Sequence, residues 1–243
     1  MTLRINMWSG PRNVSTATMY SFAQRQDTLA IDEPLYGHYL EVTGVHHPGD
    51  DEVMAHMDCD GERVVQEVIL GDHEKPIVFF KNMAHHLVEL DWGFLSQTKN
   101  ILLTRDPGKV IFSLSKKIPN PTLRDTGFQV QSELLDTFIK TGQQPPVLDS
   151  KQLLLNPPVV LKELCQQIGI PFDEAMLSWP IGPKPEDGIW AKHWYHNAHQ
   201  STGFAPYQGK IVSLPDHLKP LLEECKPHYE KLLEYAIMAD GKS

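Results

Sequence analysis

The stretch that decides the fold is residues 3–20, LRINMWSGPRNVSTATMY. Its apolar residues alternate at first, which predicts a strand through Leu3, Ile5 and Met7. Gly10 and Pro11 end that strand, and a helix begins at Ser15 and Thr16. The first backbone N–H groups of a helix have no partner inside it. A strand, a tight turn and a helix start therefore predict an anion-binding site.

The turn carries side chains suited to a phosphate or a sulfate. Arg12 supplies a permanent charge with a planar fork of donors, and Ser15 and Thr16 supply hydroxyl groups. The residues predicted to bind the anion are Gly10, Pro11, Arg12, Asn13, Val14, Ser15 and Thr16. The motif of nucleotide triphosphatases, G-x-x-x-x-G-K-[ST], is absent, which disfavours magnesium-assisted γ-phosphate chemistry. An ordinary strand-to-helix turn is the alternative.

A second segment offers a further anion site. Residues 100–105, NILLTR, form a buried-type strand that ends in Arg105, and Asp106-Pro107-Gly108 begins a helix. Ser113 follows eight residues after Arg105, so the two side chains can converge on one phosphate. The alternatives are a salt bridge from Arg105 to an acid and a Ser113 hydroxyl bonded to its own helix.

These two segments resemble the sulfotransferases that use 3′-phosphoadenosine 5′-phosphosulfate (PAPS). The resemblance implies that the first turn binds the 5′-phosphosulfate and that Arg105 and Ser113 bind the 3′-phosphate. Residues 149–179 and 214–235 resemble the late segments of that family, so the likeness covers nearly the whole chain. It implies a P-loop NTPase-like sulfotransferase fold, PAPS as co-substrate and no metal. Arg12 stands where cytosolic members have Lys.

Two groups compete for the role of general base. Glu33 follows the second expected strand and resembles the base of carbohydrate-type and tyrosine-type members. His85 and His86 follow Lys81 and resemble the Lys-x-His arrangement of cytosolic members, shifted along the chain. Lys81 is expected to touch the transferring group, and Arg12 to stabilise the leaving oxygen. A helix cap is the alternative for Glu33, and packing or solvation for the two histidines.

Strands and helices alternate along the chain. Strands are expected at 3–8, 29–32, 76–81, 100–105 and 146–149, and helices at 14–25, 60–70, 107–117, 128–141, 157–168 and 215–238, the last broken near Pro227. This predicts one three-layer α/β domain over 1–243, with a mainly parallel sheet flanked by helices. Ligands then bind at the carboxyl ends of the strands. Glu33 and Arg12 are expected to follow neighbouring strands.

The amino-acid composition argues against some classes of function. Lys and Arg number 22 against 31 Asp and Glu, a net charge of −9, which argues against a nucleic-acid partner. The three cysteines are widely spaced, which indicates a reducing compartment. No long apolar stretch is present, so we expect a cytoplasmic protein without a membrane anchor. The expected partner is a small-molecule or carbohydrate acceptor, and the sequence does not indicate an oligomeric state.

Weaker signals lie in the last third of the chain. His193, His196 and His199 recur every three residues, but no acid or cysteine completes a ligand set, and no metal is expected. Residues 190–204 are interpreted as a lid over the nucleotide, with Lys192 near the phosphates. Residues 45–49 are interpreted as a loop at the acceptor site. The competing functions are a P-loop-type kinase or hydrolase and a non-catalytic nucleotide-binding protein.

Overall fold

The computed structural model describes residues 2–241. These residues form two compact units. Unit 1 comprises residues 2–7, 15–100 and 173–204, and unit 2 comprises residues 8–14, 101–172 and 205–241. The expectation of a single domain over 1–243 stays a prediction. Each unit is described by itself below.

The five expected strands are present and form a parallel sheet of order β2-β3-β1-β4-β5. Their bounds are Leu3–Ser9 for β1, Thr28–Asp32 for β2, Ile77–Met83 for β3, Lys99–Thr104 for β4 and Val147–Asp149 for β5. Strand β3 lies between β2 and β1, so the expectation that Glu33 and Arg12 follow neighbouring strands is wrong. A parallel crossover is long enough to pass over one position in the sheet, and order along the chain does not reveal this.

Unit 1 surrounds the β2–β3 pair, in which Asp32 lies opposite Lys81. Its α-helices are α1 Ser15–Ala23, α2 Tyr36–Thr43, α3 Asp50–His56, α4 Gly61–Val64, α10 Ala191–Trp194 and α11 His196–His199. A π-helical turn, Val65–Ile69, continues α4, and 3₁₀ turns occupy Ala84–His86, Trp92–Gln97 and Glu174–Leu177. Helix α1 packs on both strands, where Phe22 stacks on Phe79 with ring centroids 4.0 Å apart.

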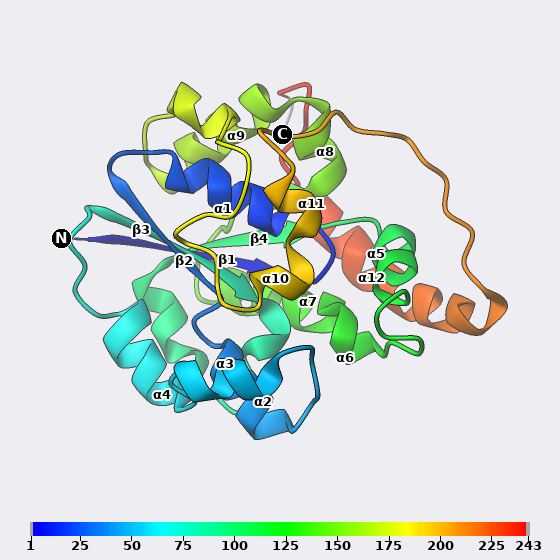
Figure 1. The fold of residues 1–243 in the computed structure, drawn as a ribbon. Helices are drawn as coiled ribbons and strands as arrows, with labels where there is room; N and C mark the ends of the chain where they lie inside the picture. The colour runs from blue at the N-terminus through cyan, green and yellow to red at the C-terminus, as the bar shows by residue number, and fades with distance from the viewer. Residues whose placement is uncertain (1, 242–243) are drawn as a thin grey trace. The chain divides into compact units, whose positions relative to one another are not determined.

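Unit 2 contains the β4–β5 pair, whose register joins Thr104 to Asp149. Its helices are α5 Pro107–Leu114, α6 Leu123–Thr126, α7 Phe128–Lys140, α8 Ser150–Leu155, α9 Pro157–Ile168 and α12 Lys219–Leu233, with a 3₁₀ turn at Asp216–Leu218. Helix α12 packs on α7 and α5 (Figure 1). The buried residues of that contact are Val110, Ile111, Phe128, Leu218, Leu221 and Cys225.

The last helix corrects one expectation. Helix α12 continues through Pro227, where the sequence predicted a break. A proline inside a helix removes one backbone hydrogen bond. Here Pro227 lies on the exposed side of the helix, where water can bond the freed carbonyl, while Leu221, Cys225 and Leu232 are buried on the other side. The burial of that face offsets the lost bond.

Two further findings bear on the class of protein. None of the helices within residues 2–241 is long and apolar enough to cross a bilayer. All three cysteines, Cys59, Cys165 and Cys225, carry free thiols.

Candidate functional site

The turn after β1 makes a close backbone approach. A Cβ atom added to Gly10 would lie 2.6 Å from the carbonyl oxygen of Thr126, so only glycine fits there. Arg12, two residues later, has a left-handed backbone with φ of 59°. Such a conformation is uncommon for a residue with a side chain and costs roughly 1–3 kcal/mol. The turn therefore holds Arg12 in a conformation that the surrounding structure must enforce.

Three of the predicted anion ligands come together in unit 2. Arg12 donates from Nε to the Ser113 hydroxyl at 3.0 Å. Arg105 donates from Nη1 to the backbone carbonyl of Arg12. All three residues are partly exposed, and within residues 2–241 neither guanidinium forms an ion pair with a carboxylate. We call Arg12, Arg105 and Ser113 the arginine cluster.

The electrostatics of the arginine cluster favour an anion. Burial lowers the pKa of Arg12. Burial and the neighbouring charge of Arg12 lower the pKa of Arg105. Both groups stay cationic, because an arginine pKa lies far above neutrality. Asp106 and Asp149 oppose this lowering at Arg105 without forming an ion pair with it. Two adjacent, half-buried positive charges without a paired carboxylate are stabilised by binding a negative group.

Gln131, which the sequence did not single out, and Asn13 tie together the segments that carry Arg12 and Arg105. Gln131 is fully buried and donates from Nε2 to the carbonyls of Trp8 at 3.0 Å and Leu103 at 2.8 Å. Asn13, predicted as a ligand, donates from Nδ2 to Leu103 at 3.3 Å. Gln131 thus ties the ends of β1 and β4 together. Its position in the expected helix 128–141 gave no sign of this role.

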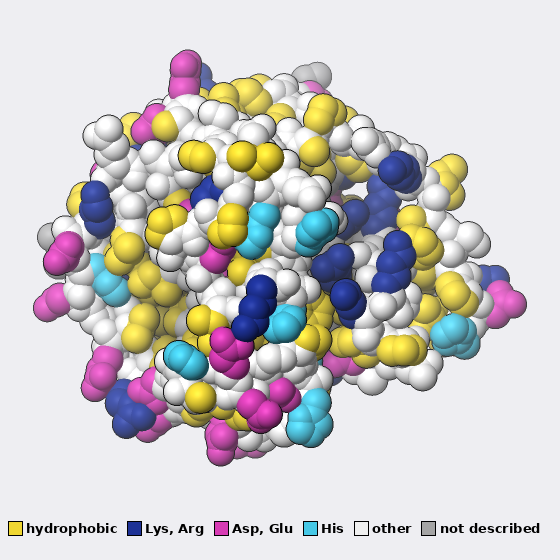
Figure 2. Space-filling view, viewed as in Figure 1, with side chains coloured by type: hydrophobic (Ala, Val, Ile, Leu, Met, Phe, Trp, Pro, Cys, Tyr) yellow, Lys and Arg dark blue, Asp and Glu magenta, His cyan; other side chains and the backbone are white. Residues whose placement is uncertain are grey.

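The start of α5 lies beside Arg105. Asp106 caps the helix by accepting a hydrogen bond from the Lys109 backbone at 2.9 Å. The Lys109 ammonium donates to the Tyr207 hydroxyl at 2.7 Å. Figure 2 shows Lys and Arg side chains gathered over the part of the surface where α5 lies. The acidic chain therefore presents a local basic surface at this helix.

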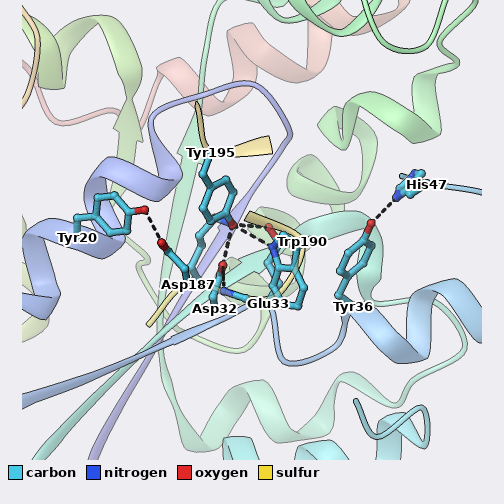
Figure 3. A network of polar contacts seen from close by, with 10 residues as sticks. Tyr20, Asp32, Glu33, Tyr36, His47, Asp187, Trp190 and Tyr195 are labelled. Atoms are coloured by element: carbon cyan, nitrogen blue, oxygen red, sulfur yellow. Dashed lines mark hydrogen bonds and ion pairs between the residues drawn. The ribbon is translucent and has the colours of Figure 1, made fainter. Parts of the chain in front are cut away.

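The second set of predicted residues lies in unit 1, at the end of β2 and in β3 (Figure 3). The Lys81 ammonium donates to Asp32 Oδ1 at 2.9 Å, to Glu33 Oε1 and to the Tyr195 hydroxyl at 2.6 Å. Tyr195 donates to Asp32 Oδ2 at 2.7 Å, and Trp190 donates to Tyr195 at 3.2 Å. We call Asp32, Glu33, Lys81 and Tyr195 the acid cluster. Sequence analysis singled out Glu33 and Lys81 but neither Asp32 nor Tyr195.

The acid cluster is buried, and burial controls its pKa values. Lys81 is 0% exposed, and Glu33 and Asp32 are 5% and 7% exposed. Burial raises the pKa of Glu33, and the charge of Asp32 adds to this effect while Lys81 opposes it. Burial lowers the pKa of Lys81, but the charges of Asp32 and Glu33 outweigh it and the pKa is raised. Glu33 has a left-handed backbone, with φ of 39°. A raised carboxyl pKa suits a general base.

The histidine pair lies in the 3₁₀ turn after β3. His85 and His86 are both buried. His86 stacks on Tyr36 and Tyr39, with ring centroids 5.1 and 4.6 Å apart. Burial holds the pKa of His86 well below its ordinary value, so this imidazole is neutral near pH 7. His85 contacts Tyr39 edge to face at 5.1 Å. Both rings are thus placed in an aromatic group.

Other predicted residues of the last third lie elsewhere in unit 1. Lys192 is exposed and pairs with Glu52 of α3. The three histidines have separate neighbours. His199 forms a hydrogen bond with Asp187 at 2.9 Å, and His196 one with Gln200 at 3.2 Å. The His193 ring lies against Gly49, where an added Cβ atom would clash with it. Within residues 2–241 no group of three His, Cys, Asp or Glu residues is placed to hold a metal ion.

The sequence model of the sulfotransferase domain matches residues 3–236. The chain belongs to the sulfotransferase domain family. Two curated relatives from Arabidopsis thaliana, branched-chain-amino-acid aminotransferase-like proteins 1 and 2, are each 38% identical to it over 229 residues, 94% of this chain. The match covers 41% of each relative, so the chain spans about two fifths of their length.

Solved structures share the fold at low sequence identity. The sulfotransferase domain of the Synechococcus PCC 7002 olefin synthase matches 92% of the chain at 18% identity, with 95% of its own length covered and a TM-score of 0.56. The domain from the curacin biosynthetic pathway matches 93% at 14% identity, with 98% of its length covered and a TM-score of 0.53. A sulfotransferase from Alicyclobacillus acidocaldarius has a TM-score of 0.55 at 12% identity and 95% coverage of its length. The expected sulfotransferase fold is therefore confirmed.

Proposed function

We propose that this chain transfers a sulfuryl group from PAPS to a hydroxyl or amine of a small-molecule or carbohydrate acceptor. The observation that carries the proposal is the arginine cluster. Two guanidinium groups and a hydroxyl are joined by hydrogen bonds, and within residues 2–241 no carboxylate forms an ion pair with either guanidinium, in a chain with a net charge of −9. An anionic ligand with more than one negative group supplies the missing charge.

The residues divide between the two ends of the nucleotide. Arg105 and Ser113 bind the 3′-phosphate. Arg12, with the backbone and hydroxyls of residues 10–16, binds the 5′-phosphosulfate and stabilises the charge that develops on the leaving phosphate oxygen. Lys192, which pairs with Glu52 on the surface, stays a prediction for phosphate contact.

In the reaction the acceptor oxygen forms a bond to sulfur as the bond from sulfur to the 5′-phosphate oxygen breaks. Adenosine 3′,5′-bisphosphate leaves, and the acceptor proton passes to a general base. Glu33 is our candidate, because burial raises the pKa of its carboxyl. Lys81 is buried and bonded to both carboxylates, so we assign it to holding Glu33 rather than to contact with the sulfuryl group. His85 and His86 are the alternative bases.

The name of the Arabidopsis relatives suggests another activity, transamination. An aminotransferase needs a lysine that reacts as a neutral amine with the cofactor aldehyde. Lys81 is the fully buried lysine of this chain within residues 2–241, and two carboxylates keep it cationic. Lys81 does not suit this chemistry, and the match leaves more than half of each relative outside it. We therefore do not extend that name to this chain.

Ligand-dependent melting tests the proposal. Adenosine 3′,5′-bisphosphate without metal is expected to raise the melting temperature, since a ligand at about 100 times its Kd adds roughly 2.7 kcal/mol to the free energy of unfolding. ATP with magnesium is expected to raise it much less. Stabilisation by ATP with magnesium and none by the bisphosphate would overturn the sulfotransferase proposal in favour of a kinase or hydrolase. Transfer to a panel of hydroxylated small molecules and sugars then tests activity.

A further inference from the structure

The acid cluster carries an unbalanced charge. It contains two carboxylates, Asp32 and Glu33, and one ammonium, Lys81. Burial and the two carboxylates raise the pKa of Tyr195 well above its ordinary value, so its hydroxyl is neutral. The ionised cluster therefore has a net charge of about −1, counted from these side chains. A buried net charge is costly, so uptake of one proton, which makes the cluster neutral, is favoured.

The hydrogen bonds decide which carboxylate takes that proton. Both oxygens of Asp32 are occupied: Oδ1 accepts from Lys81, and Oδ2 accepts from Tyr195 at 2.7 Å and from the Gly188 backbone at 3.2 Å. Donors to both oxygens stabilise the ionised form. Glu33 accepts at Oε1 only, from Lys81; the Tyr195 hydroxyl lies 3.4 Å from the same oxygen, but its one proton is donated to Asp32. Within residues 2–241 its Oε2 has no hydrogen-bond donor, so Glu33 has the oxygen that is open to a proton.

We propose that Asp32 is the counter-ion of Lys81 and that Tyr195 fixes this pairing, which leaves Glu33 as the carboxylate that receives the proton. This inference rests on the proposed function, because it assigns the surroundings of the proposed base. Asp32, Lys81 and Tyr195 are positioning residues. Without Asp32, Lys81 and Glu33 would form a neutral pair, and proton uptake would leave a buried positive charge.

Other titratable groups near the cluster do not supply this balance. Tyr36 of α2 faces Glu33 and His86 faces Lys81, and burial keeps both neutral by raising the first pKa and lowering the second. Near Asp32 are Tyr20, whose pKa is raised by burial, and Glu186, whose pKa is also raised by burial. Within residues 2–241 the one cation that contacts Glu33 is Lys81. The charge of the base is thus set by Lys81 and Asp32.

Two substitutions should move the titration of Glu33 in opposite directions. In Asp32→Asn, Glu33 is the only carboxylate that pairs with Lys81, so the pH at which Glu33 titrates should fall by about one unit or more. Lys81→Met removes the cation and raises that pH by a similar amount. The measurement is carboxyl ¹³C NMR of labelled full-length protein across pH, with Glu33→Gln to assign the signal.

Asp187→Asn is the matched control. Asp187 is a buried carboxylate of the same unit that bonds Tyr20 and His199 but not Lys81, so its loss should leave the Glu33 titration unchanged. Shifts of the same sign in Asp32→Asn and Lys81→Met, or none, would overturn the inference. If Lys81→Met does not fold, Asp32→Asn decides alone: a fall supports the pairing, and a rise or no change overturns it.

The acid limb of the pH–rate profile for sulfuryl transfer separates this inference from the proposed function. It is expected to follow the NMR titration of Glu33 in each variant. Opposite NMR shifts without transfer to any acceptor would support the charge pairing and count against the proposed function. Opposite NMR shifts with an unmoved acid limb would overturn Glu33 as the proton acceptor.

Discussion

The arginine cluster and the acid cluster differ in whether their charged groups are paired. In the arginine cluster two guanidinium groups lie half-buried, and within residues 2–241 no carboxylate pairs with either. In the acid cluster one ammonium is fully buried and bonded to two carboxylates. The arginine cluster has no ion-paired carboxylate and is suited to bind an anion from solution. In the acid cluster Lys81 balances one of the two carboxylates, and one proton neutralises the remaining negative charge.

The proposed function assigns each cluster a separate part of the reaction. Loss of a residue from the arginine cluster should weaken nucleotide binding, whereas loss of Glu33 should slow turnover at nearly unchanged affinity. Arg12 and Glu33 share one property, a left-handed backbone with φ of 59° and 39°. Strained residues of this kind gather at functional sites, where the surrounding structure enforces them. The predictions below test whether the division between binding and turnover holds.

The largest effect is expected for Glu33→Gln. The substitution keeps the volume and removes the proton acceptor, so turnover should fall about 10²–10⁴-fold while the Kd for adenosine 3′,5′-bisphosphate changes little. Steady-state rates with the best acceptor of the panel, together with calorimetry, measure both quantities. His86→Asn, in the aromatic group, is the comparison and should be milder. Near-normal turnover of Glu33→Gln beside an inactive His85 or His86 variant would move the base to the histidine pair.

A smaller effect is expected for Arg105→Ala. Loss of a charge-assisted contact to the 3′-phosphate should weaken adenosine 3′,5′-bisphosphate by about 1.5–3 kcal/mol, roughly 10- to 150-fold in Kd. Adenosine 5′-phosphosulfate lacks that phosphate and should lose much less. Calorimetry with both ligands measures the difference, and Lys140→Ala, an exposed charge at the end of α7, is the control. Equal losses for the two ligands would show that Arg105 does not read the 3′ position.

The residues of the arginine cluster could be predicted from the sequence because the patterns that mark them are local. A strand, a Gly-Pro turn and a helix start within residues 3–20 predicted the anion site, and the spacing of Arg105 and Ser113 predicted that both face one ligand. The structure joins both residues to Arg12 by hydrogen bonds. All five strands were also predicted, because buried parallel strands are short apolar runs with clear ends.

Only two of the four residues of the acid cluster, Glu33 and Lys81, were predicted from the sequence. Asp32 stands next to Glu33 in the sequence, but its pairing with Lys81 depends on the β2–β3 register. Tyr195 arrives from a segment more than 160 residues later along the chain than Asp32. No local pattern marks such contacts. One helix did leave a signal that was missed: Tyr36, Tyr39 and Leu40 have helical spacing and are buried, and Gly44 ends α2 in a left-handed conformation.

The smallest effect is expected for Ser113→Ala, and its pattern across ligands is the informative part. The Ser113 hydroxyl accepts a hydrogen bond from Arg12 Nε at 3.0 Å, so it contacts the residue proposed for the 5′-phosphosulfate while it is proposed to bind the 3′-phosphate. Its removal should weaken binding by about 0.5–1.5 kcal/mol, roughly two- to tenfold in Kd. It should weaken both adenosine 3′,5′-bisphosphate and adenosine 5′-phosphosulfate through Arg12, and the bisphosphate somewhat more, because that ligand also loses the contact to its 3′-phosphate.

Ser115→Ala is the control for Ser113→Ala, because its hydroxyl, just past the end of α5, donates to the Phe112 carbonyl at 3.2 Å. It should leave the Kd of both ligands unchanged. A Ser113→Ala loss confined to the bisphosphate would mean that the bond to Arg12 carries no binding energy and that Ser113 serves the 3′-phosphate alone. A loss for both ligands would mean that Arg12 depends on Ser113 for its orientation, so that the two ends of the nucleotide site are coupled through one hydroxyl group.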